Sequence, residues 1–170
     1  VKAKLCRSAA LDRYWAKHLA STTNRMDVSA ANFSNLLYLA GLQGKNQFQD
    51  KICLEIGCGW IPSHSIIMHL LGADKVIATD MQGVYRPEQM PIAFRDIVDS
   101  IVLDNLTAFG HREIIRERLD ALMSMNDFGT NRLRGIGIEY LAPMDFSKEM
   151  APLHYDWVFS NSVLELIPPH

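Results

Sequence analysis

The chain has 170 residues, enough for one domain with a core of its own, and its 48% hydrophobic and 21% charged residues are ordinary for a globular protein. The formal net charge of −2 argues against a surface that binds nucleic acid in bulk through its phosphates. No apolar run approaches the ~20 residues of a membrane-spanning helix, and no signal-peptide pattern opens the chain. We therefore expect a cytoplasmic protein without a membrane partner.

The first part of the chain is predicted to be helical. Residues 5–19 place apolar side chains at helical spacing, with charged residues on the other side. Asp27 or Ser29 can cap a second helix. We expect residues 1–48 to pack on, or cap, a core domain that comprises residues 49–170.

That core domain is predicted to open with a strand, a turn and a helix. Residues 52–56 form a short, nearly all-apolar run, which is typical of a buried parallel strand. Gly57 and Gly59 follow at once. Pro62 then opens an apolar segment that Gly72 closes, and this punctuation is typical of a helix.

A second strand completes a βαβ unit with a ligand-binding character. The apolar run Val76–Ala78 ends at Asp80, which lies 23 positions after Gly57, close to the ~20 expected of an acid that binds a ribose diol. Glycines at the strand exit let a ligand approach the backbone, and the following helix start offers N–H groups. An adenosine-containing cofactor is therefore our first hypothesis.

A gap of 57 residues separates Asp80 from the next strand, Ile138–Leu141, which is long for one crossover. Two amphipathic segments, 93–102 and 114–123, predict two helices, followed by a loop at Asn126–Asn131. One helix can serve as the crossover, and the stretch 84–135 therefore contains an insertion. It either forms a lid over the ligand edge or packs away from it, and its mixed charges favour a solvated face over an anion-binding one.

The chain ends with a fourth apolar strand, Trp157–Ser160, which exits at Asn161. Pro168–Pro169 is typical of the first residues of a helix, but only His170 follows it in this sequence. The chain begins at Val1, and the run Trp157–Phe159 is apolar on both faces. We therefore expect a fragment that is truncated at its carboxyl end.

The glycine turn separates two classes of adenosine cofactor. The dinucleotide pattern G-x-G-x-x-G requires a third glycine where Pro62 stands, and Glu55 would repel a pyrophosphate but suits a ligand with an ammonium group. Here the sequence resembles the class I S-adenosylmethionine-dependent methyltransferases. Their first motif, acid-x-Gly-x-Gly-x-Gly, is matched by Glu55, Gly57 and Gly59, whereas Ile61 replaces the third glycine.

The resemblance continues in Leu141–Asp145 and Tyr155–Ile167. It implies a three-layer, Rossmann-like α/β fold with a parallel sheet ordered 3-2-1-4, and S-adenosyl-L-methionine as cofactor. It also implies that Asp145 binds the adenine amine, although this residue could instead cap a helix, and that Asn161 lies beside the methionine end. The expected cofactor-binding residues are Glu55, Gly57, Cys58, Gly59, Asp80, Met81, Asp145 and Asn161.

The expected reaction is methyl transfer to an unidentified acceptor, for which we favour a small molecule. No metal site is expected. His18, His111 and Tyr85 are candidates for a general base, but a structural role is favoured for each. Two rival interpretations stay open: an NAD-dependent oxidoreductase, and a non-catalytic binding module, which the absence of a histidine at Leu166 favours.

Overall fold

A computed structural model describes residues 25–95, 99–146, 148 and 154–161. The predicted helix over residues 5–19, the helix start at Pro168–Pro169 and Leu166 lie outside these residues. Among the described helices, none is long and apolar enough to cross a lipid bilayer.

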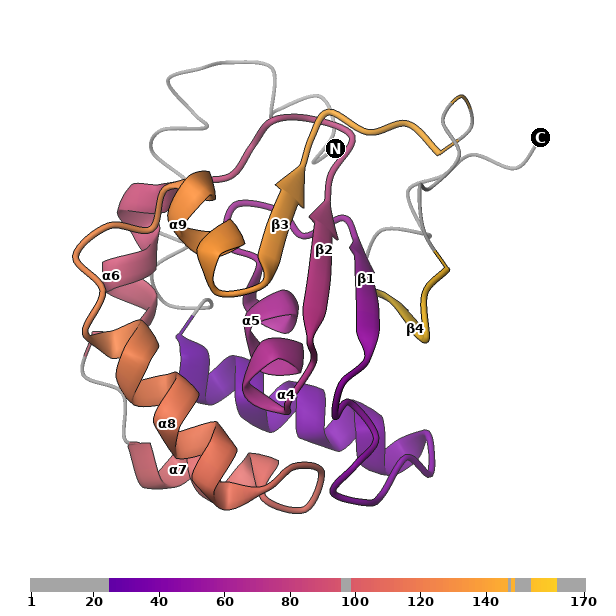
Figure 1. The fold of residues 1–170 in the computed structure, drawn as a ribbon, viewed down its shortest axis with the longest axis vertical. Coiled ribbons are helices and arrows are strands. Elements are labelled where there is room, and N and C mark those ends of the chain that lie inside the picture. Colours follow the sequence, from indigo (N-terminus) through magenta and orange to yellow (C-terminus); the bar gives the residue numbers. More distant parts are fainter. Residues whose placement is uncertain (1–24, 96–98, 147, 149–153, 162–170) are drawn as a thin grey trace, which may run out of the picture.

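The described residues form an α/β fold around a four-stranded parallel sheet in the order β3-β2-β1-β4 (Figure 1). The predicted class, strand direction and strand order are therefore confirmed. In the register of the sheet, Cys53 lies between Val76 and Trp157, so apolar side chains form a row across it. The strands are β1 (Ile52–Ile56), β2 (Lys75–Thr79), β3 (Ile138–Leu141) and β4 (Trp157–Ser160).

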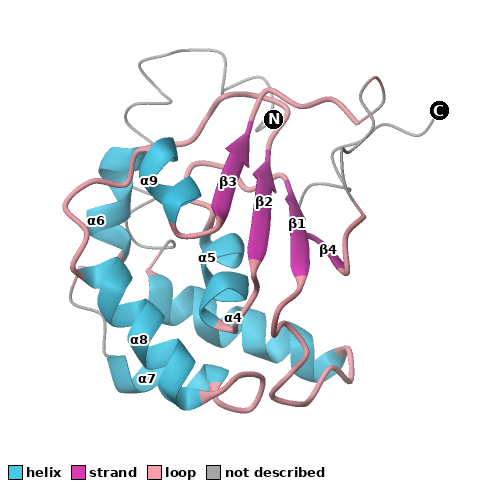
Figure 2. Ribbon diagram, viewed as in Figure 1, coloured by secondary structure: helices cyan, strands magenta, loops and turns pink. Residues whose placement is uncertain are grey.

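The helices gather on one side of this sheet (Figure 2). They are α4 (Met26–Leu39), α5 (Ser63–Leu70), the 3₁₀ turn η1 (Pro87–Gln89), α6 (Met90–Ala93), α7 (Asp99–Leu106), α8 (Arg112–Met123) and α9 (Thr130–Gly135). Helix α5 packs against β1, β2 and β3, while α4 and α8 pack against α5. The helical side is therefore itself more than one helix deep.

The strand order explains this one-sided cover. The steps from β1 to β2 and from β2 to β3 run in the same direction across the sheet, so right-handed crossovers place both connections on the same face. The step from β3 back to β4 runs the other way and would cross the opposite face. That connection spans residues 142–156, which are only partly described, and a third layer is not among the described residues.

Helix α4 begins before the predicted cap. Its N-cap is Arg25, so Asp27 and Ser29 lie in the first turn, and the prediction that one of them caps the helix is wrong. The Asp27 carboxylate accepts hydrogen bonds from the Arg25 guanidinium and from Val28 N (2.9 Å). Phe33 lies on the inward face of the helix, where it is fully buried and packs near Phe159 at 4.9 Å between ring centroids.

The stretch between β2 and β3 differs in two places from the sequence interpretation. The predicted helix over residues 93–102 is divided, because α6 ends at Ala93 and α7 runs from Asp99 to Leu106. The predicted loop Asn126–Asn131 contains the start of α9, whose polar sequence gives no apolar periodicity. The predicted helix over residues 114–123 is confirmed as α8.

Helices α7 and α8 belong to the core and do not cover the ligand edge. Val102, Leu103, Ile115 and Leu119 are buried, and both helices lie toward the amino ends of the strands, the lower end in Figure 1. The side chain of Arg118 fixes α8 to the end of α5, because its Nη1 donates to the carbonyl oxygens of His69 and Ala73 (2.8 Å for Ala73). A lid formed by these two helices is therefore not what the structure contains.

Candidate functional site

The glycine turn lies at the carboxyl ends of β1 and β2 and is fixed to β2 by its own backbone. Gly57 and Gly59 have φ values of 78° and 67°, in the left-handed region that glycine adopts without strain. The amides of Gly57 and Cys58 both donate to the carbonyl oxygen of Thr79 at 2.9 Å. The amide of Gly59 donates to Oδ2 of Asp80 at 3.0 Å. All three turn amides are thus engaged within the protein.

Asp80 follows β2 directly and is half-buried beside this turn. Its Oδ2 accepts from Gly59 N and its Oδ1 from Gln82 N, each at 3.0 Å. A carboxylate oxygen has two lone pairs, so each oxygen can accept one more hydrogen bond. Two hydroxyl donors on adjacent carbons, as in a ribose diol, match this remaining capacity.

Glu55, near the end of β1, is only 2% exposed, and both of its carboxylate oxygens are hydrogen-bonded to the first turn of α5. Its Oε2 accepts from the backbone amide of Ser65 at 2.9 Å and from the Ser65 hydroxyl at 2.5 Å. Its Oε1 accepts from Nδ1 of His64 at 2.9 Å. A negative charge at a helix N-terminus is favourable, and here the protein supplies that charge itself.

A hollow of about 340 Å³ opens beside the turn. In the sheet, β1 has β2 on one side and β4 on the other, so the strand order reverses direction at β1. The hollow lies at this switch point, which is the usual ligand position in open α/β folds. Five of the eight expected residues line it, together with four that were not expected. The lining consists of Glu55, Gly57, Cys58, Gly59, Trp60, Ile61, Ser63, His64 and Asn161.

The three remaining expected residues lie outside the lining. Asp80 borders the turn, as described above. Met81 follows it and is 66% exposed. Asp145 forms an ion pair with Lys148 at 2.7 Å, and the amide of its neighbour Met144 donates to the backbone carbonyl of Asp80 at 2.9 Å. The loop after β3 is therefore connected to the end of β2, at Asp80.

The candidate bases from the sequence do not reach the hollow. The Tyr85 hydroxyl donates to the carbonyl of Phe128 at 2.6 Å, and burial raises its pKa well above the usual value. Nε2 of His111 lies 2.8 Å from Oδ1 of Asn46, at the start of α8. His18 lies outside the described residues. The structure therefore brings none of the described candidates to the site.

Cys58 is a buried thiol. It is 6% exposed, and burial together with the nearby carboxylates of Glu55 and Asp80 raises its pKa strongly. A thiolate, the reactive form of cysteine, is disfavoured there.

Sequence reasoning missed His64 and Ser65. A signal existed, because the polar triplet Ser63–Ser65 interrupts an otherwise apolar helix at its first turn, and His64 lies nine positions after Glu55. Polar residues in the first turn of a helix that follows a strand-end acid indicate that their side chains hydrogen-bond to that acid.

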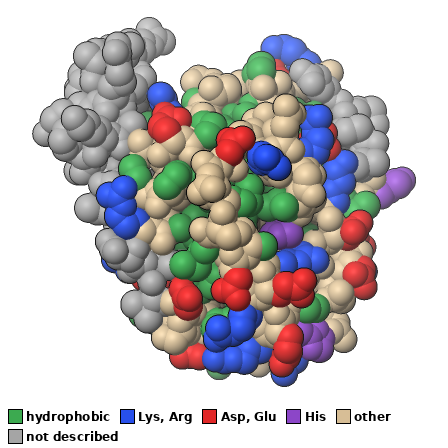
Figure 3. Space-filling model, turned by 60° about the vertical axis from the view of Figure 1, so that its left-hand side comes forward, with side chains coloured by type: hydrophobic (Ala, Val, Ile, Leu, Met, Phe, Trp, Pro, Cys, Tyr) green, Lys and Arg blue, Asp and Glu red, His purple; other side chains and the backbone are tan. Residues whose placement is uncertain are grey.

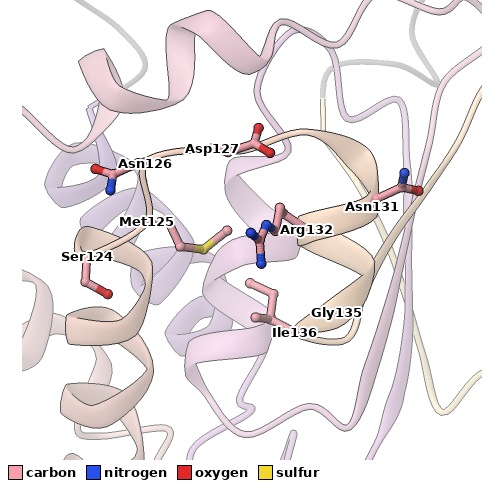
Figure 4. Close-up of a pocket in the computed structure, with 8 residues that line it drawn as sticks. All are labelled: Ser124, Met125, Asn126, Asp127, Asn131, Arg132, Gly135 and Ile136. Carbon is pink, nitrogen blue, oxygen red and sulfur yellow. The ribbon is translucent and has the colours of Figure 1, made fainter.

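A second hollow of about 470 Å³ lies between the end of α8 and α9 (Figure 4). Met125 and Arg132 extend into it, but most of its lining residues are exposed, including Asn126 and Asp127. The surrounding face carries interspersed acidic and basic side chains (Figure 3), in agreement with the predicted mixed-charge face. It has none of the buried polar groups that distinguish the hollow at the sheet edge.

Comparisons of the chain with models of protein families, with curated proteins and with solved structures found no match.

Proposed function

We propose that the chain binds S-adenosyl-L-methionine and takes part in methyl transfer to a small-molecule acceptor. The observation that carries this proposal is the state of the glycine turn. Its three amides are already donated, to Thr79 and Asp80, while Asp80 retains capacity for a diol. The turn therefore suits an adenosine ligand that needs the ribose acid but no phosphate cradle.

The same observation weighs against a nicotinamide dinucleotide. A pyrophosphate binds to free N–H groups at the glycine turn and at the start of the following helix. Here the carboxylate of Glu55 occupies the start of α5 and accepts from Ser65 N. A pyrophosphate would have to displace this carboxylate or lie beside it, and like charges repel.

Methyl transfer from a sulfonium requires little chemical activation by the protein. The sulfonium carries a methyl group that is already activated for displacement, so the protein aligns the acceptor with it and excludes water. The hollow at the switch point adjoins both the turn and Asn161 after β4. In our proposal it holds the part of the cofactor beyond the ribose, and the acceptor enters from its open side.

Calorimetric titration of the 170-residue chain tests the proposal. We expect binding of S-adenosylmethionine and S-adenosylhomocysteine at micromolar concentration and no binding of NAD in the same range. Binding of NAD alone would favour the oxidoreductase, and binding of none of the three would refute the cofactor assignment.

Asp80→Ala is expected to weaken S-adenosylhomocysteine binding by ~1–3 kcal/mol, because it removes the acceptor of the ribose hydroxyls. Asp127→Ala is a matched control, since Asp127 accepts from the amide two residues ahead, Gly129 N, just as Asp80 accepts from Gln82 N. The control should bind like the parent. Equal affinity of Asp80→Ala and the parent would contradict the ribose role.

A further inference from the structure

His64 presents its ring to the hollow and is held in place by three neighbours. Nδ1 lies 2.9 Å from Oε1 of Glu55, and the ring centroid lies 4.8 Å from that of Phe159 and 5.7 Å from that of Phe33. Its side chain is 16% exposed, and it is one of the residues that line the hollow. The aromatic rings and the carboxylate together fix the orientation of the imidazole.

The carboxylate also fixes which ring nitrogen carries the proton. Both oxygens of Glu55 act as acceptors, so Nδ1 of His64 donates to it. In the neutral ring, Nε2 then carries a lone pair. No side chain in the described part of the chain offers Nε2 a hydrogen bond, so this lone pair is available to a ligand.

The charges around His64 are negative. Glu55 faces it from β1, and Asp80 binds the glycine turn from the side of β2. The Cys58 thiol is neutral because burial and these two carboxylates raise its pKa. The elements α4 and β4 present uncharged phenylalanine rings. A cation is therefore the ligand group that this end of the hollow favours.

Building on the methyltransferase function proposed above, we propose that Nε2 of His64 accepts a hydrogen bond from the ammonium group of the cofactor's amino-acid end. Glu55 itself is only 2% exposed and already binds three protein donors, on His64 and Ser65, whereas the ring of His64 lines the hollow. Its charge acts through the imidazole, which donates to Glu55 at one nitrogen and accepts from the ligand at the other. His64 is a binding residue, and Glu55 is the residue that positions it.

This arrangement makes cofactor affinity depend on pH. Protonation of Nε2 removes the acceptor and adds a positive charge that repels the ammonium. Affinity for a ligand with an ammonium group should therefore fall once the ring is protonated. A ligand without that group should be insensitive to the change or bind slightly better.

Two adenosine thioethers isolate the ammonium group. One is the 5′-aminopropyl thioether, which has the ammonium but no carboxylate, and the other is the 5′-carboxypropyl thioether, which has the carboxylate but no ammonium. Titrating the chain with each at pH 8 and pH 5.5, we expect the aminopropyl compound to lose about tenfold or more in affinity at the lower pH. A loss confined to the carboxypropyl compound would overturn the proposal.

Two variants of His64 complete the test. His64→Gln offers an acceptor that does not titrate, so it should bind the aminopropyl compound with little pH dependence. His64→Phe keeps the ring but has no acceptor, and should bind it weakly at both pH values. His111→Gln, which changes a histidine at the start of α8, should retain the parent's pH dependence. An unchanged pH dependence in His64→Gln would refute the role of His64, even if His64→Phe does not fold.

The outcomes separate this inference from the proposed function. If neither thioether nor S-adenosylhomocysteine binds at any pH, the cofactor assignment itself is wrong. If all three bind with the same response to pH, the assignment stands and the role of His64 is refuted.

Discussion

Glu55→Ala should lower the free energy of unfolding by about 3 kcal/mol or more, the largest effect that we expect of any single substitution at the site. The change leaves three donors without their acceptor: the amide and hydroxyl of Ser65 and Nδ1 of His64. Ser65 is fully buried, so water does not replace the lost partner easily. Urea denaturation followed by circular dichroism measures the loss.

Glu55→Gln should lie between the parent and Glu55→Ala. Its amide oxygen can still accept from Ser65, while its NH₂ group meets Nδ1 of His64. Glu88→Ala is the control, because the Glu88 side chain is 62% exposed and its distance to Arg86 is 4.0 Å. A loss below about 1 kcal/mol for Glu55→Ala would mean that Ser65 and His64 find other partners.

His69 should make the protein unstable in acid. It lies in the last turn of α5 and is 7% exposed, and burial and the Arg118 charge lower its pKa to about 4. Between pH 6.5 and 4 the unfolded chain binds a proton that the folded chain does not, so the free energy of unfolding falls as the pH is lowered. This lowering of the pKa from 6.5 to about 4 corresponds to about 3 kcal/mol of stability lost by pH 4, and His69 contributes nothing to the pH dependence above about pH 7.

His69→Gln should remove this part of the acid sensitivity. Urea denaturation at several pH values between 7.5 and 4 should show the difference between the variant and the parent growing in the variant's favour as the pH falls. Carboxylates contribute equally to both proteins and cancel in the comparison. His111→Gln should follow the parent, and so would His69→Gln if His69 were protonated in the folded state.

The sheet could be predicted from sequence because each strand is a short apolar run next to a strong turn signal. Buried parallel strands need apolar residues on both faces, and β1 and β2 have them. The glycine turn and Asp80 followed from spacing, because a βαβ unit brings both to the same edge.

The helices between β2 and β3 were harder to place. Their apolar stripes predict helices but not which neighbour each stripe packs against, and only tertiary contacts showed that α7 and α8 complete the core around α4 and α5. Helix α9 has one buried residue, Leu133, so it carries almost no periodic signal. From sequence alone, the start of this helix at Thr130 is therefore predicted to be part of a loop.

Glu55 illustrates what a motif does not contain. The sequence interpretation assigned this acid to a ligand's ammonium, and the structure adds that Ser65 and His64 already hydrogen-bond to its oxygens. A motif gives the residue type and its spacing along the chain. It does not give the side chains that compete for the same hydrogen bonds, and here the competitors lie in the helix that follows.

The carboxylate at the start of α5 also has a consequence for engineering. Replacing Pro62 with glycine would complete the dinucleotide pattern in the sequence, yet the amides of the turn and of Ser65 would still be engaged within the protein. A phosphate at the start of α5 would therefore require the loss of Glu55 as well as the new glycine.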